Sequence, residues 1–244
     1  MPPQTPAEPP TSPVEGHDET GDGIAQIAEM ISHELRGPIT TIKGLAATTV
    51  RYYDRLPEDE KLEFLSMIER EADRLLEISD EVALALRLDS GVVVPRPRAV
   101  DLSALVGEGL ELLPSDTREI ARRLDPGIEV RVDPELVARA ICHVVANADR
   151  YSPPGEAIEI RGHRADDAAS LEIEDQGPGI PQERRAEVFA RFARWRPAGY
   201  EDRQGTGLGL FISRGLVRAC GGEIEIDGGS EGGTIVRIRL PLED

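Results

Sequence analysis

The sequence contains only two cysteines and no long apolar run. Each of these features excludes a class of protein. Its two cysteines, Cys142 and Cys220, both lie in apolar, helix-like contexts. Two lone thiols indicate a reducing compartment and no disulfide framework. No apolar segment approaches the length of a transmembrane helix, and the start of the chain does not resemble a signal sequence. We therefore expect a soluble, cytoplasmic chain, either whole or part of a longer protein.

The chain also lacks an excess of positive charge. It carries 28 basic and 46 acidic side chains, which gives a formal net charge of −18. Such a chain repels nucleic acid and anionic membrane surfaces, so we expect neither as a partner. An anionic ligand would have to be held by a local arrangement of groups, because the overall field opposes it.

The first part of the chain predicts a tail followed by two helices. Residues 1–23 are rich in Pro, Thr, Glu and Gly and predict a disordered tail. Residues 24–90 predict a helical hairpin that turns at Pro57 and ends before Gly91, a plausible C-cap. The second helix has an apolar seam at strict three-four spacing: Leu65, Ile68, Ala72, Leu75, Ser79, Val82 and Leu86. One hairpin buries its seam poorly, which favours a dimeric four-helix bundle. The heptads alone favour a generic coiled-coil hairpin.

The second part predicts an α/β sandwich. Residues 91–100 contain two prolines and indicate a linker, and residues 101–244 mix helical and strand periods. Asp101 and Asp133-Pro134 are helix starts, and a third helix is expected over Thr206–Cys220. Alternating segments predict strands over residues 118–124, 128–132, 158–164, 170–175, 223–227 and 234–240. The whole chain is thus expected to have an α+β fold, with a mixed sheet covered by helices on one face.

Three glycine clusters lie where strands end or helices begin. They read "DQGPGI" (175–180), "GTGLGL" (205–210) and "GGT" (232–234). Glycine lets the backbone approach a ligand closely, and the N–H groups at a helix start favour phosphate. Each cluster alone fits a turn better than a ligand site. Three of them, following a helix that bears an asparagine, favour a nucleotide site.

That helix ends in "ICHVVANADRYSPPG" and carries Asn147, Arg150 and Tyr151 near its C-terminal end. The amide oxygen of Asn147 suits Mg²⁺, which keeps most of its waters and is shared with phosphates. Arg150 is placed to meet the phosphates. Asn147 as a simple helix cap is an equally good interpretation of this segment alone.

From Ile24 to Leu242 the chain resembles the transmitter core of two-component sensor histidine kinases. The segment "SHELRGPIT" (32–40) matches the phosphoacceptor histidine box, and "HVVANADRYSPPG" (143–155) matches the asparagine box. The first glycine box, the phenylalanine box "VFARFAR" (188–194) and the second glycine box follow in the order typical of this family. Five motifs in the right order make the resemblance specific. Only the N-terminal tail lies outside it.

The resemblance implies a HisKA-type dimerisation and phosphoacceptor hairpin followed by a GHKL-type ATP-binding domain. His33 would be phosphorylated by ATP with Mg²⁺ and would pass the phosphoryl group to a response regulator. Glu34 would accept the second N–H of the imidazole ring and stabilise the charge that grows during attack. His33 lies two residues from both Ile31 and Leu35, which predicts that it points away from the seam. A solvated helix face is the simpler interpretation of His33 and Glu34 without the other motifs. The chain would act as a homodimer and would be cytoplasmic, either alone or as the soluble part of a longer sensor.

The resemblance also assigns the nucleotide contacts. Asp175 would bind the exocyclic amine of adenine, in a wall shaped by Gly177, Gly179 and Ile180 and supported by Thr234. The phosphates would be lined by Gly205, Thr206, Gly207, Leu208 and Gly209, with Asn147 as the metal ligand and Arg150 and Tyr151 beside them.

Residues 181–204 would form a lid over this site, with Phe189 and Phe192 as anchors. The lid contains six arginines, some of them placed to offset the local acidity: Arg184, Arg185, Arg191, Arg194, Arg196 and Arg203. Its Trp195 is the only tryptophan of the chain.

Two positions depart from the family pattern. His143 stands where the asparagine box usually has a second asparagine. An imidazole there would contact the phosphates or the Mg²⁺ shell, although it is a poorer ligand for this cation, or it would simply face the neighbouring layer. Gly37 stands four residues after His33, where kinases that also dephosphorylate their regulator usually carry Thr or Asn. Glycine predicts weak or absent phosphatase activity.

Pro38 follows Gly37 and predicts a bend in the first helix. Proline removes the N–H that would bond the carbonyl of Glu34. Flexing at this bend would switch His33 between a dimer-packed and an ATP-accessible state.

Two other functions compete with a histidine kinase. A serine-phosphorylating anti-sigma kinase has a related ATP-binding domain, but it lacks the histidine box and the hairpin. A non-catalytic, nucleotide-binding dimeric scaffold remains open because of His143.

Overall fold

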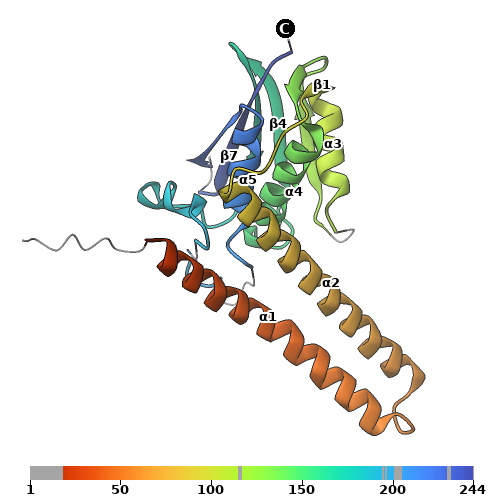
Figure 1. Cartoon of the computed structure of the whole chain (residues 1–244). Helices are drawn as coiled ribbons and strands as arrows, with labels where there is room; N and C mark the ends of the chain where they lie inside the picture. Colours follow the sequence, from red (N-terminus) through yellow and green to blue (C-terminus); the bar gives the residue numbers. More distant parts are fainter. Residues whose placement is uncertain are drawn as a thin grey trace, which may run out of the picture.

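The computed structural model describes residues 19–114, 117–193, 195, 197–200, 205–229 and 232–243, without the side chains of residues 19–30 and 33. Two long helices, α1 (Glu19–Tyr52) and α2 (Glu58–Asp89), form the predicted hairpin. Helix α1 begins before the expected Ile24 and ends at Tyr52, before Pro57. The predicted disordered tail (1–23) is therefore wrong for residues 19–23, which belong to α1, and residues 1–18 lie outside the described residues. Figure 1 shows the hairpin projecting from a compact α/β part.

The hairpin exposes much of its predicted apolar seam. Leu65 and Leu86 of α2 are 54% and 50% exposed, whereas Ile78, Leu84 and Ala85 on another side of the helix are buried. Leu84 and Ala85 belong to the same core cluster as the helices of the α/β part. The end of α2 therefore packs on the α/β part, together with Val82 of the seam, whereas Leu65 and Leu86 of the seam stay exposed.

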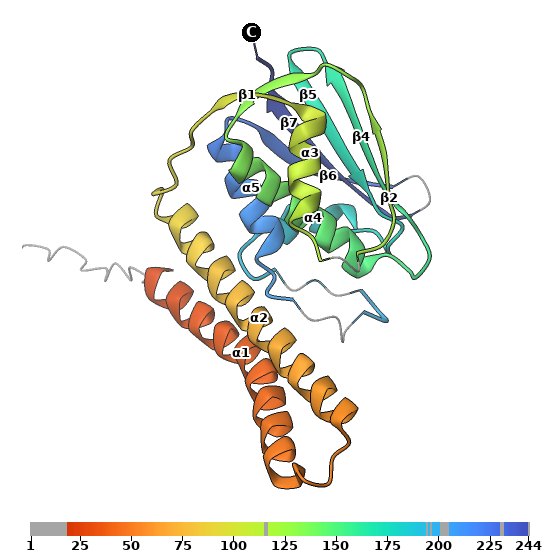
Figure 2. The same cartoon turned by 90° about the vertical axis from the view of Figure 1, so that its right-hand side faces the viewer.

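The α/β part is built on a five-stranded mixed sheet in the order β2-β4-β5-β7-β6. Strand β2 runs parallel to β4, and the other neighbours are antiparallel. The strands are β2 (Ile120–Leu124), β4 (Ile158–Ala165), β5 (Ala168–Glu174), β6 (Glu223–Gly228) and β7 (Thr234–Pro241). Figure 2 shows helices α3 (Leu102–Glu111), α4 (Pro134–Tyr151) and α5 (Gly209–Ala219) together on one side of this sheet. The predicted α+β fold, a hairpin followed by a mixed α/β sandwich, is confirmed.

Local sequence signals explain where these elements begin and turn. Asp101 and Asp133 cap α3 and α4, each accepting bonds from two backbone N–H groups through its carboxylate. Asp166, with a φ of 47°, lies in the tight turn between β4 and β5. Strand β7 alternates strictly between buried and half-buried residues, as a strand with one face on the core must.

The two faces of the sheet differ in chemistry. Alternate residues such as Ile160, Ile173 and Ile238 are buried under the helices. On the other face, Arg161 of β4 pairs with Glu159 of the same strand and with Glu172 and Glu174 of the neighbouring β5. Arg237 continues this network through Glu172 and Asp227. Cross-strand pairs of opposite charge let this face meet solvent, so the core forms on the helix side.

Two parts of the sequence prediction need correction. Residues 98–100 fall in the predicted linker, but Arg98–Asp101 forms strand β1, which pairs antiparallel with β3 (Glu129–Val132). Four residues are too few to show the alternation that identifies a strand. Helix α5 begins at Gly209 and not at Thr206, because the glycine-rich segment before it stays outside the helix. Among the described residues, none of the helices combines the length and the apolar character needed to span a membrane.

Candidate functional site

One cavity of about 610 Å³ lies between the hairpin and the α/β part. Helix α2 contributes charged side chains to it, including Asp73, Glu77 and Glu81, and α1 contributes Glu34. The α/β part contributes most of the residues predicted as a nucleotide site: His143, Asn147, Arg150, Tyr151, Asp175, Gly179, Ile180, Gly205, Thr206, Gly207, Gly209 and Thr234. Residues far apart in the sequence are thus brought to one place.

Asp175 lies at the end of β5, and its buried carboxylate is held by the backbone. Its Oδ1 accepts hydrogen bonds from the N–H of Gly177 at 2.8 Å and of Thr234 at 3.2 Å. Burial raises the pKa of Asp175, while these bonds oppose the shift. The apolar side chains of Ile173, Ile226 and Val236 line the same cavity. A carboxylate among apolar groups suits a flat heterocycle that carries an amino group.

The first and third glycine clusters pack against each other. A Cβ on Gly233 would collide with the carbonyl oxygen of Asp175, and a Cβ on Gly179 would collide with that of Gly232. Gly179 also has a φ of +69°. Several of these glycines are therefore needed for the contact between two loops, besides leaving room for a ligand. Gly177 does not line the cavity, and a Cβ on it would meet the carbonyl oxygen of Tyr151 at 2.9 Å.

The C-terminal end of α4 is held by Arg118, a residue to which the sequence assigned no role. Its guanidinium donates to Asp149 Oδ1 at 2.6 Å and to backbone carbonyls of Asp149, Ser152, Pro153 and Glu156. Such bonds satisfy carbonyl groups that a helix end leaves unpaired. Asn147 lies just before the bonded segment, and Arg150 and Tyr151 lie within it, so Arg118 fixes the helix end from which they reach the cavity.

The second glycine cluster lies between α4 and α5. A Cβ on Gly205 would meet the guanidinium of Arg150 at 2.7 Å, so the loop and this arginine are in close contact. Gly207 has a φ of +69° and packs on Ala193 and Phe192. The side chain of Leu208, which the resemblance assigned to the phosphate loop, is completely buried in the core and does not line the cavity. Its backbone N–H donates to Thr206 Oγ1 at 3.2 Å.

His143 is half-buried where α4 faces α2. Its Nδ1 lies 3.7 Å from Oε1 of Glu81. Burial lowers the pKa of His143 to about 4, and the charges of Arg139 and Arg150 lower it further, so the imidazole is neutral at pH 7. The side chain lines the cavity and also faces the neighbouring helix. The sequence left open whether His143 contacts the phosphates or faces the neighbouring layer, and this position fits both.

Glu81 joins the hairpin to the site through a short polar contact. Its Oε2 accepts the hydroxyl hydrogen of Thr206 at 2.5 Å. Burial raises the pKa of Glu81, and the bond from Thr206 and the charge of Arg150 oppose the shift. Sequence motifs gave no signal for this contact, because it depends on how α2 packs against α4 and α5.

Glu34 lies in α1 and is buried at the hairpin end of the cavity. His33 is the preceding residue of the same helix. The predicted outward direction of His33 and its predicted pairing with Glu34 concern a side chain outside the described part of the structure. Glu34 of the histidine box thus lines the same cavity as Asn147 and Asp175.

The lid segment (181–204) begins with two short 3-10 turns, η1 (Gln182–Arg184) and η2 (Glu187–Phe189). Phe189 is buried and Phe192 packs on the core, as expected for anchors. Trp195 lines the cavity, and the ring of Tyr200 lies 5.9 Å from that of Tyr151.

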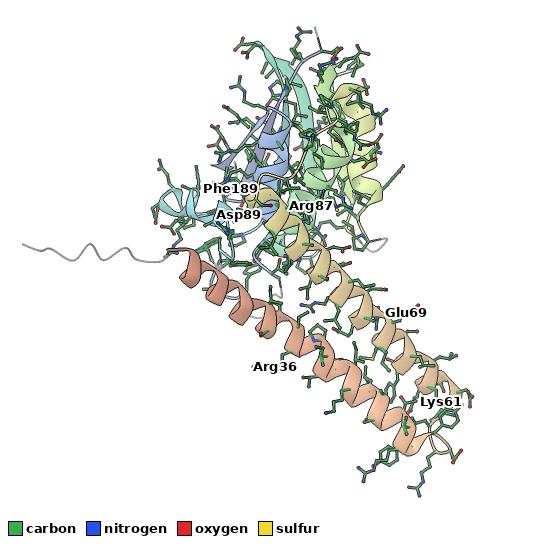
Figure 3. The ribbon with its side chains drawn as sticks, in the orientation of Figure 1. Arg36, Lys61, Glu69, Arg87, Asp89 and Phe189 are labelled. Carbon is green, nitrogen blue, oxygen red and sulfur yellow. The ribbon has the colours of Figure 1, made fainter. Side chains whose placement is uncertain are left out.

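The described lid arginines pair with protein groups. Arg184 contacts Glu187, Arg185 contacts Asp227 and Arg191 contacts Asp89 at 2.8 Å. Figure 3 shows Asp89 at the end of α2 that meets the α/β part, with Lys61 at the opposite end of the helix. These three arginines therefore stabilise the lid and its junction with α2. Arg194, Arg196 and Arg203 lie outside the described residues.

The residues at the site fit a magnesium ion that is shared with phosphates. In the described part of the chain, no group of three or more His, Cys, Asp and Glu side chains is arranged to hold a metal ion. A Mg²⁺ beside Asn147 would take its remaining ligands from phosphates and water, as this cation commonly does.

Comparison with known proteins identifies the family. The family model of the His Kinase A (phospho-acceptor) domain matches residues 24–91. The family model of the histidine kinase-, DNA gyrase B- and HSP90-like ATPase matches residues 132–244. A solved structure of the mycobacterial sensor histidine kinase MprB is 32% identical, with a TM-score of 0.54, and the match covers 99% of that chain and 61% of this one. The chain belongs to the histidine kinase family.

Other histidine kinases match over most of the chain. The signal transduction histidine-protein kinase/phosphatase MprB of Mycolicibacterium smegmatis is 31% identical over 233 residues, covering 91% of this chain and 46% of that protein. The circadian input-output histidine kinase CikA of Synechococcus elongatus is 28% identical, covering 86% of this chain and 29% of that protein. This chain thus spans less than half the length of these curated relatives.

A crystal structure of the histidine kinase ThkA in complex with the response regulator protein TrrA shares the fold. Its TM-score is 0.68 at 21% identity, and the match covers 92% of this chain and 64% of that one. The resemblance drawn from the five sequence motifs is confirmed.

Proposed function

We propose that this chain is an ATP-dependent protein histidine kinase that autophosphorylates at His33 and passes the phosphoryl group to an aspartate of a response regulator. One observation carries the proposal. A single cavity joins Glu34, the neighbour of His33 in α1, to Asn147, Asp175 and the glycine-rich loops of the α/β part. A phosphate donor bound in this cavity would lie close to the phosphoacceptor helix.

The adenine would lie at the Asp175 end of the cavity. The carboxylate of Asp175 would accept a hydrogen bond from the exocyclic amine, with Gly177 and Thr234 fixing its orientation through their N–H groups. Gly179, Ile180 and the apolar side chains of the sheet would contact the faces of the purine. This arrangement supports adenine over guanine, because guanine has a carbonyl group in place of that amine.

The phosphates would lie toward Arg150 and the loop formed by Gly205, Thr206, Gly207 and Gly209. Helix α5 begins at this loop, and its free N–H groups favour an anion. Asn147 would hold Mg²⁺ together with the phosphates. The ion would neutralise phosphate charge and fix the terminal phosphate for attack.

The transfer uses the neutral imidazole of His33. A ring nitrogen forms a bond to the γ-phosphorus as the bond from that phosphorus to the bridging oxygen breaks, and ADP leaves. The other ring nitrogen donates a hydrogen bond to Glu34, which stabilises the charge growing on the ring. The phosphoryl group then passes to the carboxylate of the regulator.

We propose that the active form is a homodimer in the cytoplasm. The hairpin exposes large apolar side chains: Ile39, Val50, Tyr53, Leu62, Leu65, Leu76 and Leu86. Pairing of two hairpins would bury this surface in a four-helix bundle. The need for ATP supports the cytoplasm as the compartment.

Incubation with γ-labelled ATP and Mg²⁺ tests the proposal. We expect protein-bound label that is lost in acid and kept in base, as phosphohistidine is, and that moves to an added receiver domain. Acid-stable label would instead indicate a serine kinase. Nucleotide binding without label would indicate the non-catalytic scaffold.

A further inference from the structure

Glu81 of α2 reaches into the part of the cavity that the proposed function assigns to the phosphates. One carboxylate oxygen accepts the hydroxyl hydrogen of Thr206 at 2.5 Å, and the other lies 3.7 Å from Nδ1 of His143. Thr206 belongs to the loop that would hold the phosphates. A carboxylate of the hairpin therefore occupies a hydrogen-bonding position that a phosphate oxygen would use.

Among the described residues, Arg150 and Glu34 carry the charges that act on Glu81, and these have opposite signs. The side chain is three-quarters buried, which weakens its hydration. His143 is neutral at pH 7, so its contact with Glu81 is not an ion pair. Glu34 lies near enough to act on Glu81 as a second negative charge, while Arg150 acts on it as a positive charge. Arg150 is also the cation proposed to meet the phosphates.

Glu81 and a bound triphosphate would therefore compete for the same groups. Both are anions, both need Thr206 and Arg150, and repulsion between them is strong where water is scarce. We propose that Glu81 is a positioning residue of the nucleotide site, which holds the loop 205–209 on the hairpin until the phosphates displace it. This inference rests on the proposed function.

The contact is one of several that join the hairpin to the α/β part. Leu88 packs on Gly215 of α5, and Asp89 forms an ion pair with Arg191 of the lid. Displacement of Glu81 removes a polar contact from this junction and leaves the other two. Nucleotide binding and docking of the α/β part on α2 are thus linked, and each weakens the other.

Substitution of Glu81 by glutamine removes the negative charge of the side chain and keeps its shape. Glutamine can still accept the hydrogen bond from Thr206 but carries no charge. Isothermal titration calorimetry would compare Mg²⁺–ATP with adenosine, which has no phosphate. We expect Glu81→Gln to bind ATP at least about threefold more tightly and to bind adenosine as the wild type does.

Asp80→Asn is the matched control. Asp80 is exposed on the same helix, is adjacent in sequence and undergoes the same change of charge. We expect it to bind both ligands as the wild type does. In the autophosphorylation reaction, the ATP concentration for half-maximal rate should fall in Glu81→Gln and not in Asp80→Asn.

The outcomes separate this inference from the proposed function. Unchanged or weaker ATP binding by Glu81→Gln, in a chain that still labels at a histidine, would overturn only the role of Glu81. An equal gain for adenosine and ATP would also overturn it, because competition with phosphate predicts no gain for adenosine. A wild-type chain that binds neither ligand would overturn the proposed function itself.

Discussion

The carboxylate of Asp175 accepts a hydrogen bond from the backbone N–H of Thr234 at 3.2 Å, although the two residues are 59 positions apart in the chain. The bond joins the end of β5 to the start of β7. The first and third glycine clusters can approach each other here because their glycines have no side chains. This junction orients the only acidic group proposed to recognise adenine.

Replacing Asp175 by asparagine should weaken ATP binding about tenfold or more. A hydrogen bond to a charged group contributes about 1.5–3 kcal/mol, and about 1.4 kcal/mol corresponds to tenfold in affinity. Titration calorimetry measures the change. Asp167→Asn in the turn after β4 is the control, because Asp167 is 90% exposed and does not line the cavity. Equal ATP affinity for Asp175→Asn and the wild type would show that adenine is not bound by this carboxylate.

His143 should make the folded chain less stable in mild acid. The unfolded chain binds a proton at this residue near pH 6.5, whereas burial lowers the pKa in the folded state to about 4. Protonation therefore favours the unfolded state as the pH falls from 6.5 to 4. Linkage gives a loss of about 2 kcal/mol in the free energy of unfolding between pH 7 and pH 5.

Denaturant unfolding of the wild type and of His143→Asn at both pH values tests this loss. The variant carries the residue usual in the family, and its stability should fall by about 2 kcal/mol less than that of the wild type between pH 7 and pH 5. NMR titration of the imidazole gives a direct check. A midpoint near 6.5 for His143 would contradict the half-buried, neutral state.

Replacing Pro38 by alanine should change the rate of autophosphorylation more than the stability of the fold. Helix α1 continues through the buried Pro38, and Figure 2 shows its axis changing direction along its length. The hydroxyl groups of Thr40 and Thr41 bond the carbonyls of Arg36 and Gly37, which also favours bending. Alanine would restore the N–H and straighten this turn.

The rate of label incorporation and the melting temperature should be measured together for Pro38→Ala. Gly44→Ala is the matched control, because it adds helix propensity elsewhere in α1 and its new Cβ would meet no atom within 4 Å. We expect the control to keep the wild-type rate. Identical rates for Pro38→Ala and the wild type would exclude a role of the bend in catalysis.

The chain should show weak or absent phosphatase activity toward its regulator, and Gly37→Thr should gain it. A Cβ at Gly37 would meet no atom within 4 Å, so the backbone leaves room for a side chain to start here. The hydroxyl of threonine would supply the group that positions a water for attack. The assay follows loss of label from a phosphorylated receiver domain with ADP present.

Gly37→Ala separates the hydroxyl from the added methyl group in this assay. It should remain as weak a phosphatase as the wild type. Strong, nucleotide-stimulated dephosphorylation by the wild type would refute the prediction, and so would equal activities of the alanine and threonine variants.

Much of the fold follows from local patterns in the sequence. The caps at Asp101 and Asp133, the turn at Asp166 and the alternation along β7 each depend on residues that are neighbours in the chain. Such signals do not need knowledge of the tertiary structure. The motif order further predicted that His143, Asn147 and Asp175 would meet, and the structure places all three around one cavity.

The contacts between elements could not be predicted in the same way. Arg118 clamps the end of α4, and Glu81 bonds Thr206, only because packing brings these elements together. Leu208 was assigned to the phosphate loop by its motif, but its apolar side chain is buried in the core between two cavity-lining glycines. A motif predicts which segment forms a site. It does not predict the direction of each side chain, because that depends on packing.

The most direct test of the central claim is incorporation of the γ-phosphoryl group of ATP into the wild type, His33→Gln and His163→Gln. His163 lies on β4, away from the cavity, and controls for loss of any histidine. We predict acid-labile label in the wild type and in His163→Gln, and none in His33→Gln. Label in His33→Gln at the level of the wild type would contradict His33 as the phosphoacceptor.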